Sequence, residues 1–414
     1  MYKKIFLNQC GYHTEMMKKV TFRTEEPVEF CVLTSDGRNV FEGRAEQRVC
    51  NEAAKEINYV GDFSDIKEVG RYYIIAKGLG ESDTFEIGES VYHDAFQKAM
   101  HFFYLQRCGC ELPEQAAGEF THKVCHAEMA TVYGTEEKLD VTGGWHDAGD
   151  YGRYVGPGAM AVAQLLSAYE ENQEMAKRYT NSAQQKKEMP AYLEELKYEL
   201  DWMMKMQRED GALYHKVGCY QFCGFIMPED EKDELVISPV SVTATADFAA
   251  VTAMAVRHYK GYDEKYAQKL TAASKKAYNV LKDMELPGGF KNPKEITTGE
   301  YDDVCDKDER YWAAAELYKT FGDEEYRTDF EALIQEKIYH GYGWADMGSY
   351  GNVAYLTTEY PVSEQIQERI KKSMIELADE KLETVEADGY GTALKANEYI
   401  WGSNLSVANN GLHL

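Results

Sequence analysis

The sequence lacks any apolar run of the length that a membrane-spanning helix needs, about 18 to 20 residues, because charged residues interrupt its longest apolar stretches. The amino-terminal segment MYKKIFLNQCGY has lysines but neither an apolar core nor a small-residue cleavage site, so it does not resemble a secretory signal. We therefore expect a soluble, cytoplasmic protein, or a secreted one if a signal was trimmed from the sequence.

Positive charge is also scarce. The chain has 45 Lys and Arg against 71 Asp and Glu, which gives a formal net charge of −26. Binding to a nucleic acid begins with a basic surface, so this balance excludes nucleic acids as partners and disfavours an anionic membrane. A solvated helical face such as KKEMPAYLEELKYE explains part of the charge without any function.

The sequence has nine cysteines, an odd number, so they cannot all pair in disulfides within the chain. A chain of 414 residues does not need disulfides to be stable, so we expect a reducing compartment. The apolar fraction of 44% is sufficient for a large core, and the length suggests two domains or one large domain with an appendage.

The first 88 residues have short apolar stretches that alternate with period two and are separated by turn residues. They include VEFCVLT, the turn Ser35–Arg38, and GRYYIIAKG. This pattern predicts a small antiparallel β sandwich.

From Val91 onward the apolar residues recur at helical spacing. The pattern predicts helices at 91–107, 155–172, 190–207, 239–259, 265–282, 308–321, 323–339, 363–382 and from 401 to the end. Long loops rich in Gly, Tyr, Asp and Trp separate them, and no fixed period is present. We expect a helical barrel whose loops form a cleft at one end.

The strongest chemical signal is the segment DVTGGWHDAGDYGRY at Asp140–Tyr154. Asp147 and Asp150 lie three residues apart, and the glycines permit a tight backbone that directs both side chains to one place. Two such carboxylates could polarise a water molecule, one as general base and one as its positioning partner. A helix cap or a calcium site would explain an isolated pair of this kind equally well.

The whole segment resembles the signature of glycoside hydrolase family 9, the inverting endo-β-1,4-glucanases. Further similar stretches are FYLQRCGCELP at Phe103–Pro113, TATADFAAVTAMA at Thr243–Ala255, DKDERYWAAAELY at Asp306–Tyr318, GWADMGSYG at Gly343–Gly351 and YIWGSN at Tyr399–Asn404. The segments IFLNQCGYHTEMMKKVTF and DFSDIKEVGRYYI resemble the immunoglobulin-like domain of one branch of the family. The resemblance implies an immunoglobulin-like domain at residues 1–88 and an (α/α)6-barrel catalytic domain at residues 89–414, truncated at its carboxyl terminus.

The resemblance also implies catalytic roles: Asp150 is the general base, and Asp147 helps to hold the nucleophilic water. Inversion requires an acid on the other side of the scissile bond, and in this family it is a Glu near the carboxyl terminus. The late acids Glu359, Glu383, Glu386 and Glu398 match no such motif. We therefore expect the general acid beyond Leu414, unless the chain is an inactive member of the family.

A second constellation consists of Cys108, Cys125, His126 and His146. Two thiolates and two imidazoles suit a closed, tetrahedral structural zinc, although buried cysteines and unrelated histidines would also give this pattern. The immunoglobulin-bearing branch places a zinc on the corresponding positions, which favours the site. Cys110 is a competing ligand outside the family's Arg-Cys-Gly context.

Calcium is the other cofactor that the resemblance allows. The acidic loops at Pro228–Glu231 and Tyr301–Asp303 could hold it, but they also read as solvated acidic runs.

Sugar rings stack on flat aromatic side chains, so the cleft should present Trp and Tyr. Trp401 is the best candidate for such a platform and Tyr301 the next, whereas Trp202 and Trp312 lie in helix patterns and should belong to the core.

We therefore expect the protein to hydrolyse β-1,4-glucosidic bonds in cellulose-type glucans, with soluble cello-oligosaccharides or mixed-linkage fragments as substrates of a cytoplasmic enzyme. The alternatives are an exo-acting glucosidase or glucosaminidase of the same family, and a non-catalytic glycan-binding protein.

Overall fold

The computed structural model describes residues 3–181, 188–285 and 289–414, which form two compact units. One unit comprises Met1–Lys98 together with Met374–Leu414, and the other comprises Ala99–Ser373. No helix in the described ranges is both long and apolar enough to cross a membrane. All nine cysteines have free thiols.

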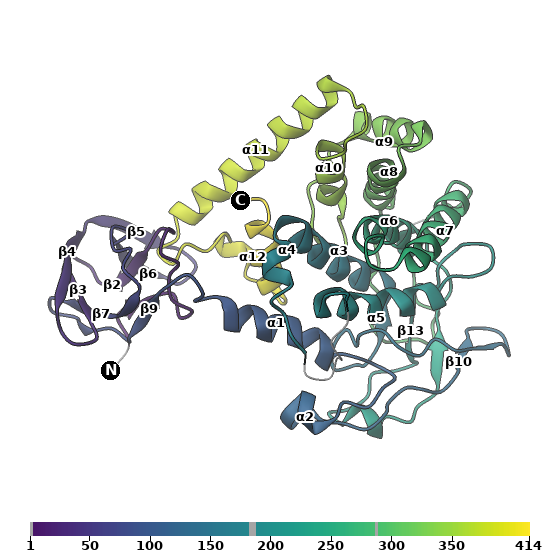
Figure 1. Cartoon of the computed structure of the whole chain (residues 1–414), viewed down its shortest axis with the longest axis horizontal. Coiled ribbons are helices and arrows are strands. Elements are labelled where there is room, and N and C mark those ends of the chain that lie inside the picture. The colour runs from purple at the N-terminus through teal and green to yellow at the C-terminus, as the bar shows by residue number, and fades with distance from the viewer. Residues whose placement is uncertain (1–2, 182–187, 286–288) are drawn as a thin grey trace. The chain divides into compact units, whose positions relative to one another are not determined.

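The first unit contains a β sandwich of two antiparallel sheets (Figure 1). One sheet has the order β1 (Ile5–Phe6), β2 (Lys19–Arg23), β6 (Glu56–Asp62), β5 (Gln47–Asn51). The other has the order β4 (Asn39–Ala45), β3 (Val28–Thr34), β7 (Gly70–Ala76), β8 (Gly80–Glu81), with β9 (Phe85–Ile87) also paired to β7. The period-two pattern puts Val28, Phe30 and Val32 of β3 in the core, which confirms the predicted sandwich.

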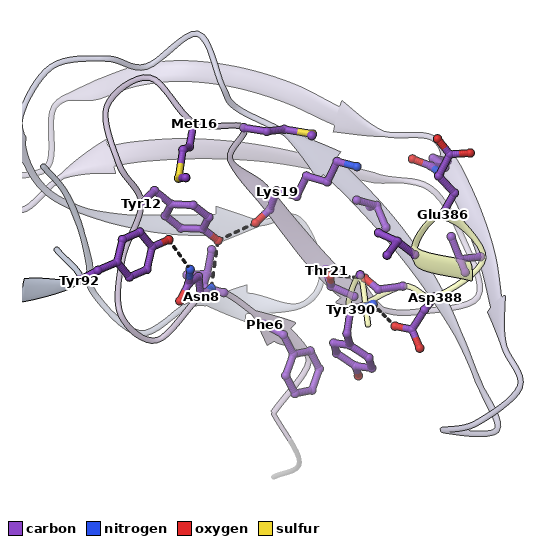
Figure 2. Close-up of a pocket in the computed structure, with 18 residues that line it drawn as sticks. Phe6, Asn8, Tyr12, Met16, Lys19, Thr21, Tyr92, Glu386, Asp388 and Tyr390 are labelled. Carbon is purple, nitrogen blue, oxygen red and sulfur yellow. Dashed lines mark hydrogen bonds between the residues drawn. The ribbon is translucent and has the colours of Figure 1, made fainter. Parts of the chain in front are cut away.

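A pocket of about 530 Å³ lies in this unit beside β2 (Figure 2). Its lining combines residues of the sandwich with the segment 385–391, which begins in the last turn of helix α11 (Glu364–Glu386). The contact between the two is partly polar, because Thr21 Oγ1 donates a hydrogen bond of 2.6 Å to the carbonyl oxygen of Gly389. The Tyr12 hydroxyl is used internally and donates to the Lys19 carbonyl oxygen at 2.6 Å. The pocket therefore has walls that are held by hydrogen bonds of the unit itself.

The rest of the chain is mainly helical. In chain order the helices are α1 (His93–Leu105), α2 (Glu114–Ala117), α3 (Val155–Glu171), α4 (Gln173–Ala176), α5 (Ala191–Lys205), α6 (Val242–Tyr259), α7 (Glu264–Leu281), α8 (Lys307–Phe321), α9 (Glu324–Glu336), α10 (Gly348–Leu356), α11 (Glu364–Glu386) and α12 (Ser403–Gly411). All nine helices expected from the periodicity are present, and the predicted boundary after residue 88 falls between β9 and α1.

Within Ala99–Ser373 the helices form an inner and an outer layer. Helices α3, α6, α8 and α10 pack in succession against one another, while α5 packs on α3, α7 on α6 and α9 on α8 (Figure 1). Helix α6 has 17 of its 18 residues buried, as an inner helix must, whereas α7 buries only one face. Ser241 caps α6 by accepting a hydrogen bond of 3.1 Å from the Ala244 N–H. Trp202 and Trp312 are buried in this core, as the sequence predicts.

The loops of this unit are more ordered than the sequence suggests. Five short strands form a sheet with the order β11 (Lys138–Leu139), β10 (Ala130–Val132), β14 (Leu235–Ile237), β13 (Lys216–Cys219), β12 (Arg153–Tyr154). The sequence predicts only long loops here, because strands of two to four residues are too short to produce a recognisable alternation. Strand β12 comes directly before α3, so the sheet fixes the place where the Asp140–Tyr154 segment enters the helix.

Candidate active site

The two carboxylates lie on a turn between Trp145 and strand β12. The turn is closed by a hydrogen bond of 2.9 Å from the Asp147 N–H to the Gly152 carbonyl oxygen. Gly152 leaves no room for a side chain, since a Cβ atom there would lie 2.9 Å from Asp150 Oδ2 and 2.7 Å from the Tyr154 ring. The glycine therefore allows the turn to hold Asp147 and Asp150 together.

Only one of the two carboxylate oxygens of Asp150 accepts a hydrogen bond from the described residues. The Tyr154 hydroxyl donates a hydrogen bond of 2.6 Å to Asp150 Oδ2. Asp150 Oδ1 has no hydrogen-bond partner among the described residues, although it is shielded from solvent. Burial beside this carboxylate raises the pKa of the Tyr154 hydroxyl, so Tyr154 remains a donor across the physiological range. Asp150 thus presents a fixed carboxylate with a free oxygen that can accept a proton.

Asp147 is held by a second phenol. The Tyr301 hydroxyl donates a hydrogen bond of 2.8 Å to Asp147 Oδ2. The Asp147 side chain reaches solvent, but the protein around it removes enough hydration to raise its pKa to about 6, and the nearby Asp150 charge acts in the same direction. The Tyr301 hydrogen bond favours the charged form and limits this rise.

Tyr301 was expected to be a sugar platform. Its ring packs edge-on against Tyr154 and against Trp344, at centroid distances of 4.8 and 5.2 Å. Its backbone has a φ of 46°, in the left-handed region that only a few residues other than glycine adopt. The structure therefore places Tyr301 at the carboxylate pair, where its hydroxyl orients Asp147.

Trp401 lies in the other unit, and its side chain is almost fully exposed. Its role as a sugar platform stays a prediction.

Two buried glutamates of helix α5 accept hydrogen bonds from Trp145, the residue at which the segment enters the turn. The Trp145 N–H donates to Glu199 Oε2 at 2.6 Å, and the Trp145 indole N–H donates to Glu195 Oε1 at 3.0 Å. Arg107 in turn binds both oxygens of Glu195 at 3.0 and 2.9 Å. Burial raises the pKa of Glu199 to about 8, so this side chain is mostly protonated at neutral pH.

The four predicted zinc ligands come together directly beside the turn. The ligand atoms of Cys108, Cys125, His126 and His146 all lie within 4.8 Å of one another, and all four residues are buried. His146 Nε2 is 3.3 Å from His126 Nδ1 and 3.9 Å from Cys125 Sγ. Ligands around a tetrahedral zinc are about 3.3 to 3.8 Å apart, so the donor set and its spacing suit this ion.

The backbone links this cluster to the turn. The His146 N–H donates to the Gln106 carbonyl oxygen at 2.7 Å, and the Cys108 N–H donates to the Gly144 carbonyl oxygen at 2.8 Å. Hydrogen bonds from Cys108 and both histidines lower the pKa of the Cys125 thiol to about 2. Cys110 does not belong to the group of ligand atoms.

Glu231 completes the surroundings of His126 and was not recognised in the sequence. Its Oε2 lies 2.8 Å from His126 Nε2, on the side of the ring away from the cluster. A carboxylate in this position fixes the tautomer and orientation of a metal-binding histidine. Glu231 belongs to the acidic loop considered for calcium, and 105 residues of chain separate it from His126.

A second acidic cluster lies at the start of α8. Carboxylate oxygens of Asp303, Asp308 and Glu309 lie within 4.8 Å of one another in buried positions. Asp303 Oδ2 and both Glu309 oxygens have no hydrogen-bond partner among the described residues. Burial raises the pKa of Asp308 to about 7. Asp302, the neighbour of Asp303 in the predicted calcium loop, instead pairs with Lys291 Nζ at 2.7 Å.

Comparisons with known proteins agree with this architecture. The model of glycosyl hydrolase family 9 matches residues 92–414, and the model of the cellulase N-terminal ig-like domain matches residues 1–81. The cellodextrinase of Butyrivibrio fibrisolvens is 38% identical over 98% of this chain and 77% of its own length. Endoglucanase D of Acetivibrio thermocellus is 39% identical over 99% of this chain and 67% of its own length.

A solved structure gives the same result for the fold. A single-mutant thermostable endoglucanase from Alicyclobacillus acidocaldarius superposes with a TM-score of 0.93 at 34% identity, over 100% of this chain and 77% of that chain. The fold class is therefore the (α/α)6 barrel with an amino-terminal immunoglobulin-like sandwich, as the resemblance implied.

Proposed function

Because this chain belongs to glycosyl hydrolase family 9, we propose that it hydrolyses β-1,4-glucosidic bonds of cellulose-type glucans and cello-oligosaccharides with inversion at the anomeric carbon. The observation that supports this most directly is the pair Asp147 and Asp150, each held by a phenol, with one free oxygen on Asp150.

In this mechanism Asp150 Oδ1 removes a proton from a water molecule while the water oxygen bonds to the anomeric carbon. The glycosidic bond breaks on the opposite face of the sugar, and the leaving oxygen takes a proton from a general acid. Asp147 accepts the second hydrogen of the water and so directs its lone pair to the carbon. The two phenols keep both carboxylates in position during the reaction.

The base is tested by replacing Asp150 with Asn. We expect kcat on a soluble mixed-linkage glucan to fall by roughly 10²- to 10⁴-fold with little change in KM, because water is no longer activated. A substrate with a good leaving group, such as 2,4-dinitrophenyl β-cellobioside, makes the measurement independent of the general acid. Nuclear magnetic resonance should show the α-anomer as the first product.

The matched control is Asp140→Asn, which changes an exposed carboxylate of the same segment. It should retain full activity. If Asp150→Asn also retained it, the base assignment would be wrong. Endo action is separated from the exo-acting alternative by comparing the fall in viscosity of the glucan solution with the release of reducing ends, because only internal cleavage lowers the viscosity quickly.

We also propose that Cys108, Cys125, His126 and His146 hold a structural zinc. With four protein ligands the ion has no open position, so it would contribute no chemistry to the reaction and would hold the backbone next to Asp147. The donor set and the orienting Glu231 support this assignment. Elemental analysis of protein purified without chelator should give about one zinc per chain, and a clearly lower content would contradict it.

Calcium is proposed for the cluster Asp303, Asp308 and Glu309. Buried carboxylates with unpartnered oxygens need either protons or a cation, and hard oxygen ligands suit calcium. The same elemental analysis tests this site, since protein without bound calcium after dialysis against a calcium buffer would argue against it.

A further inference from the structure

The loop at residues 220–234 joins β13 to β14 and exposes an unusual number of apolar side chains. Phe222, Phe225, Ile226 and Met227 have exposed fractions of 58%, 113%, 42% and 44%. We refer to these four residues as the apolar rim. Single exposed apolar side chains are common on proteins, but four within six residues form a patch that normally indicates a binding surface.

The rim is attached to the catalytic turn by hydrogen bonds. The Tyr151 hydroxyl, one residue after Asp150, donates to the Ile226 carbonyl oxygen at 2.5 Å. The Cys223 thiol donates to the Gly149 carbonyl oxygen, one residue before Asp150, at 3.5 Å. The rim is therefore held on both sides of the proposed base.

The start of the loop is fixed as well. Strand β13 pairs with β12, and a Cβ atom on Gly218 would lie 3.4 Å from Gly152 Cα in the turn. The Thr297 N–H donates to the Tyr220 carbonyl oxygen at 2.7 Å. These contacts give the exposed side chains a defined position relative to Asp150, so ligand binding there would not have to order a free loop.

The chemistry of the loop favours a neutral ligand with an apolar face. Residues 220–234 contain one cation, Lys232, and five acids, Glu229, Asp230, Glu231, Asp233 and Glu234, and this excess of negative charge disfavours an anionic polymer or membrane. The faces of glucose rings in a β-1,4 chain are apolar and stack on aromatic side chains, and Phe222 and Phe225 offer two such rings.

We propose that the apolar rim binds the part of the glucan chain that extends beyond the sugars on either side of the cleaved bond, and that it sets the preference for chain length. This inference rests on the proposed function, because it takes the occupant to be the substrate. Phe225 is the main contact, since its ring is fully exposed.

Binding is measured in the Asp150→Asn background, with cellohexaose and cellotriose as probes in calorimetry. Phe225→Ala should weaken cellohexaose binding roughly tenfold, because a tenfold change corresponds to the loss of a single aromatic contact. Cellotriose binding should change less than twofold. Phe225→Trp should restore cellohexaose binding, whereas Phe120→Ala, which removes another exposed aromatic side chain outside the loop, should have no effect.

In the active enzyme the same Phe225→Ala change should raise KM for cellohexaose and leave both kinetic constants for 2,4-dinitrophenyl β-cellobioside unchanged. Unchanged cellohexaose binding, or an equal loss for both probes, would overturn the proposal. So would a shift from dimer to monomer in sedimentation with glucan binding intact, because the rim would then be a subunit contact.

These outcomes are separate from the proposed function. If the parent protein bound cellohexaose through Phe225 but did not hydrolyse 2,4-dinitrophenyl β-cellobioside, which needs no general acid, the rim would stand and the hydrolase mechanism would fail. If it bound no glucan, the rim assignment would be wrong.

Discussion

Asp147 and Asp150 are chemically identical side chains whose surroundings give them different properties. Asp150 keeps one oxygen free while Tyr154 holds the other. Asp147 lies where lost hydration raises its pKa to about 6, and Tyr301 offsets part of that rise. The proposed division of roles between base and positioning partner rests on these contacts and not on residue type.

The pKa of Asp147 predicts the acid limb of the activity profile. Its folded-state value of about 6 is above the ordinary value, so Asp147 is half protonated at about pH 6, and protonation removes the charge that would position the water. We expect kcat/KM to decline below about pH 6.

Tyr301→Phe should move this limb to higher pH by roughly half to one unit, because it removes the hydrogen bond that favours the charged form. The measurement is kcat/KM from pH 4 to 8, with Tyr360→Phe as a control on an exposed tyrosine. A limb that stayed in place or moved to lower pH would show that Asp147 does not determine it.

At the scale of elements, the long periodic segments were predictable and the short ones were not. Helices such as α6 and α7 have enough turns for their apolar pattern to be recognised, and β3 alternates over seven residues. Helix α10 was missed because its nine residues include two glycines and small side chains. The strands β10 to β14 are fixed by pairing between distant segments, which has no local pattern.

The same distinction applies to the site. The residues of the Asp140–Tyr154 segment could be found because they are adjacent in sequence, and the resemblance indicated which cysteines and histidines to consider. Glu199, Glu231 and the contact of Tyr301 with Asp147 could not, because 54, 105 and 154 residues separate the partners. Only the packing of helices and loops determines which distant side chain reaches the turn.

Helix α5 supports the turn through Glu199, and this support can be tested. The pKa of about 8 in the folded state exceeds the unfolded value of about 4.3, so the contribution of Glu199 to stability is lost as the pH rises from about 4 towards 8. Glu199→Gln keeps an acceptor for the Trp145 N–H without any ionisation, so it should be at least as stable as wild type at pH 7.

Glu199→Ala should instead cost about 1 to 3 kcal/mol, since it leaves the buried Trp145 N–H unpaired. Urea unfolding of both variants from pH 5 to 8 provides the measurement. If Glu199→Gln lowered the free energy of unfolding as much as Glu199→Ala, Glu199 would have to act as an anion. That result would contradict the raised pKa that its burial causes.

The whole molecule consists of two compact units with different contents. Ala99–Ser373 contains the turn, the Cys and His cluster, the carboxylate cluster at the start of α8 and the apolar rim. The other unit contains the sandwich. Chains of this organisation need not unfold in a single step. The four tryptophans Trp145, Trp202, Trp312 and Trp344 lie in Ala99–Ser373, and Trp401 lies in the unit that contains the sandwich.

This distribution allows the proposed zinc to be assigned to one unfolding step. In a Trp401→Phe variant all tryptophan fluorescence comes from Ala99–Ser373. A chelator selective for transition metals over calcium should lower the melting temperature of that fluorescence signal by roughly 5 to 15 °C and leave the calorimetric transition of the sandwich unit unchanged.

Cys125→Ser should start with the lower melting temperature and should not respond to the chelator. An equal response of this variant and its parent would mean that the metal effect arises elsewhere in the molecule.

The burial of α6 has a consequence for the dynamics of the barrel unit. Seventeen of its 18 residues are covered by neighbouring helices, so small local openings cannot bring its backbone amides to water. Those amide protons should exchange with deuterium only when the entire unit opens. Exchange rates along α6 would therefore report the opening free energy of the barrel unit alone, under native conditions and without denaturant.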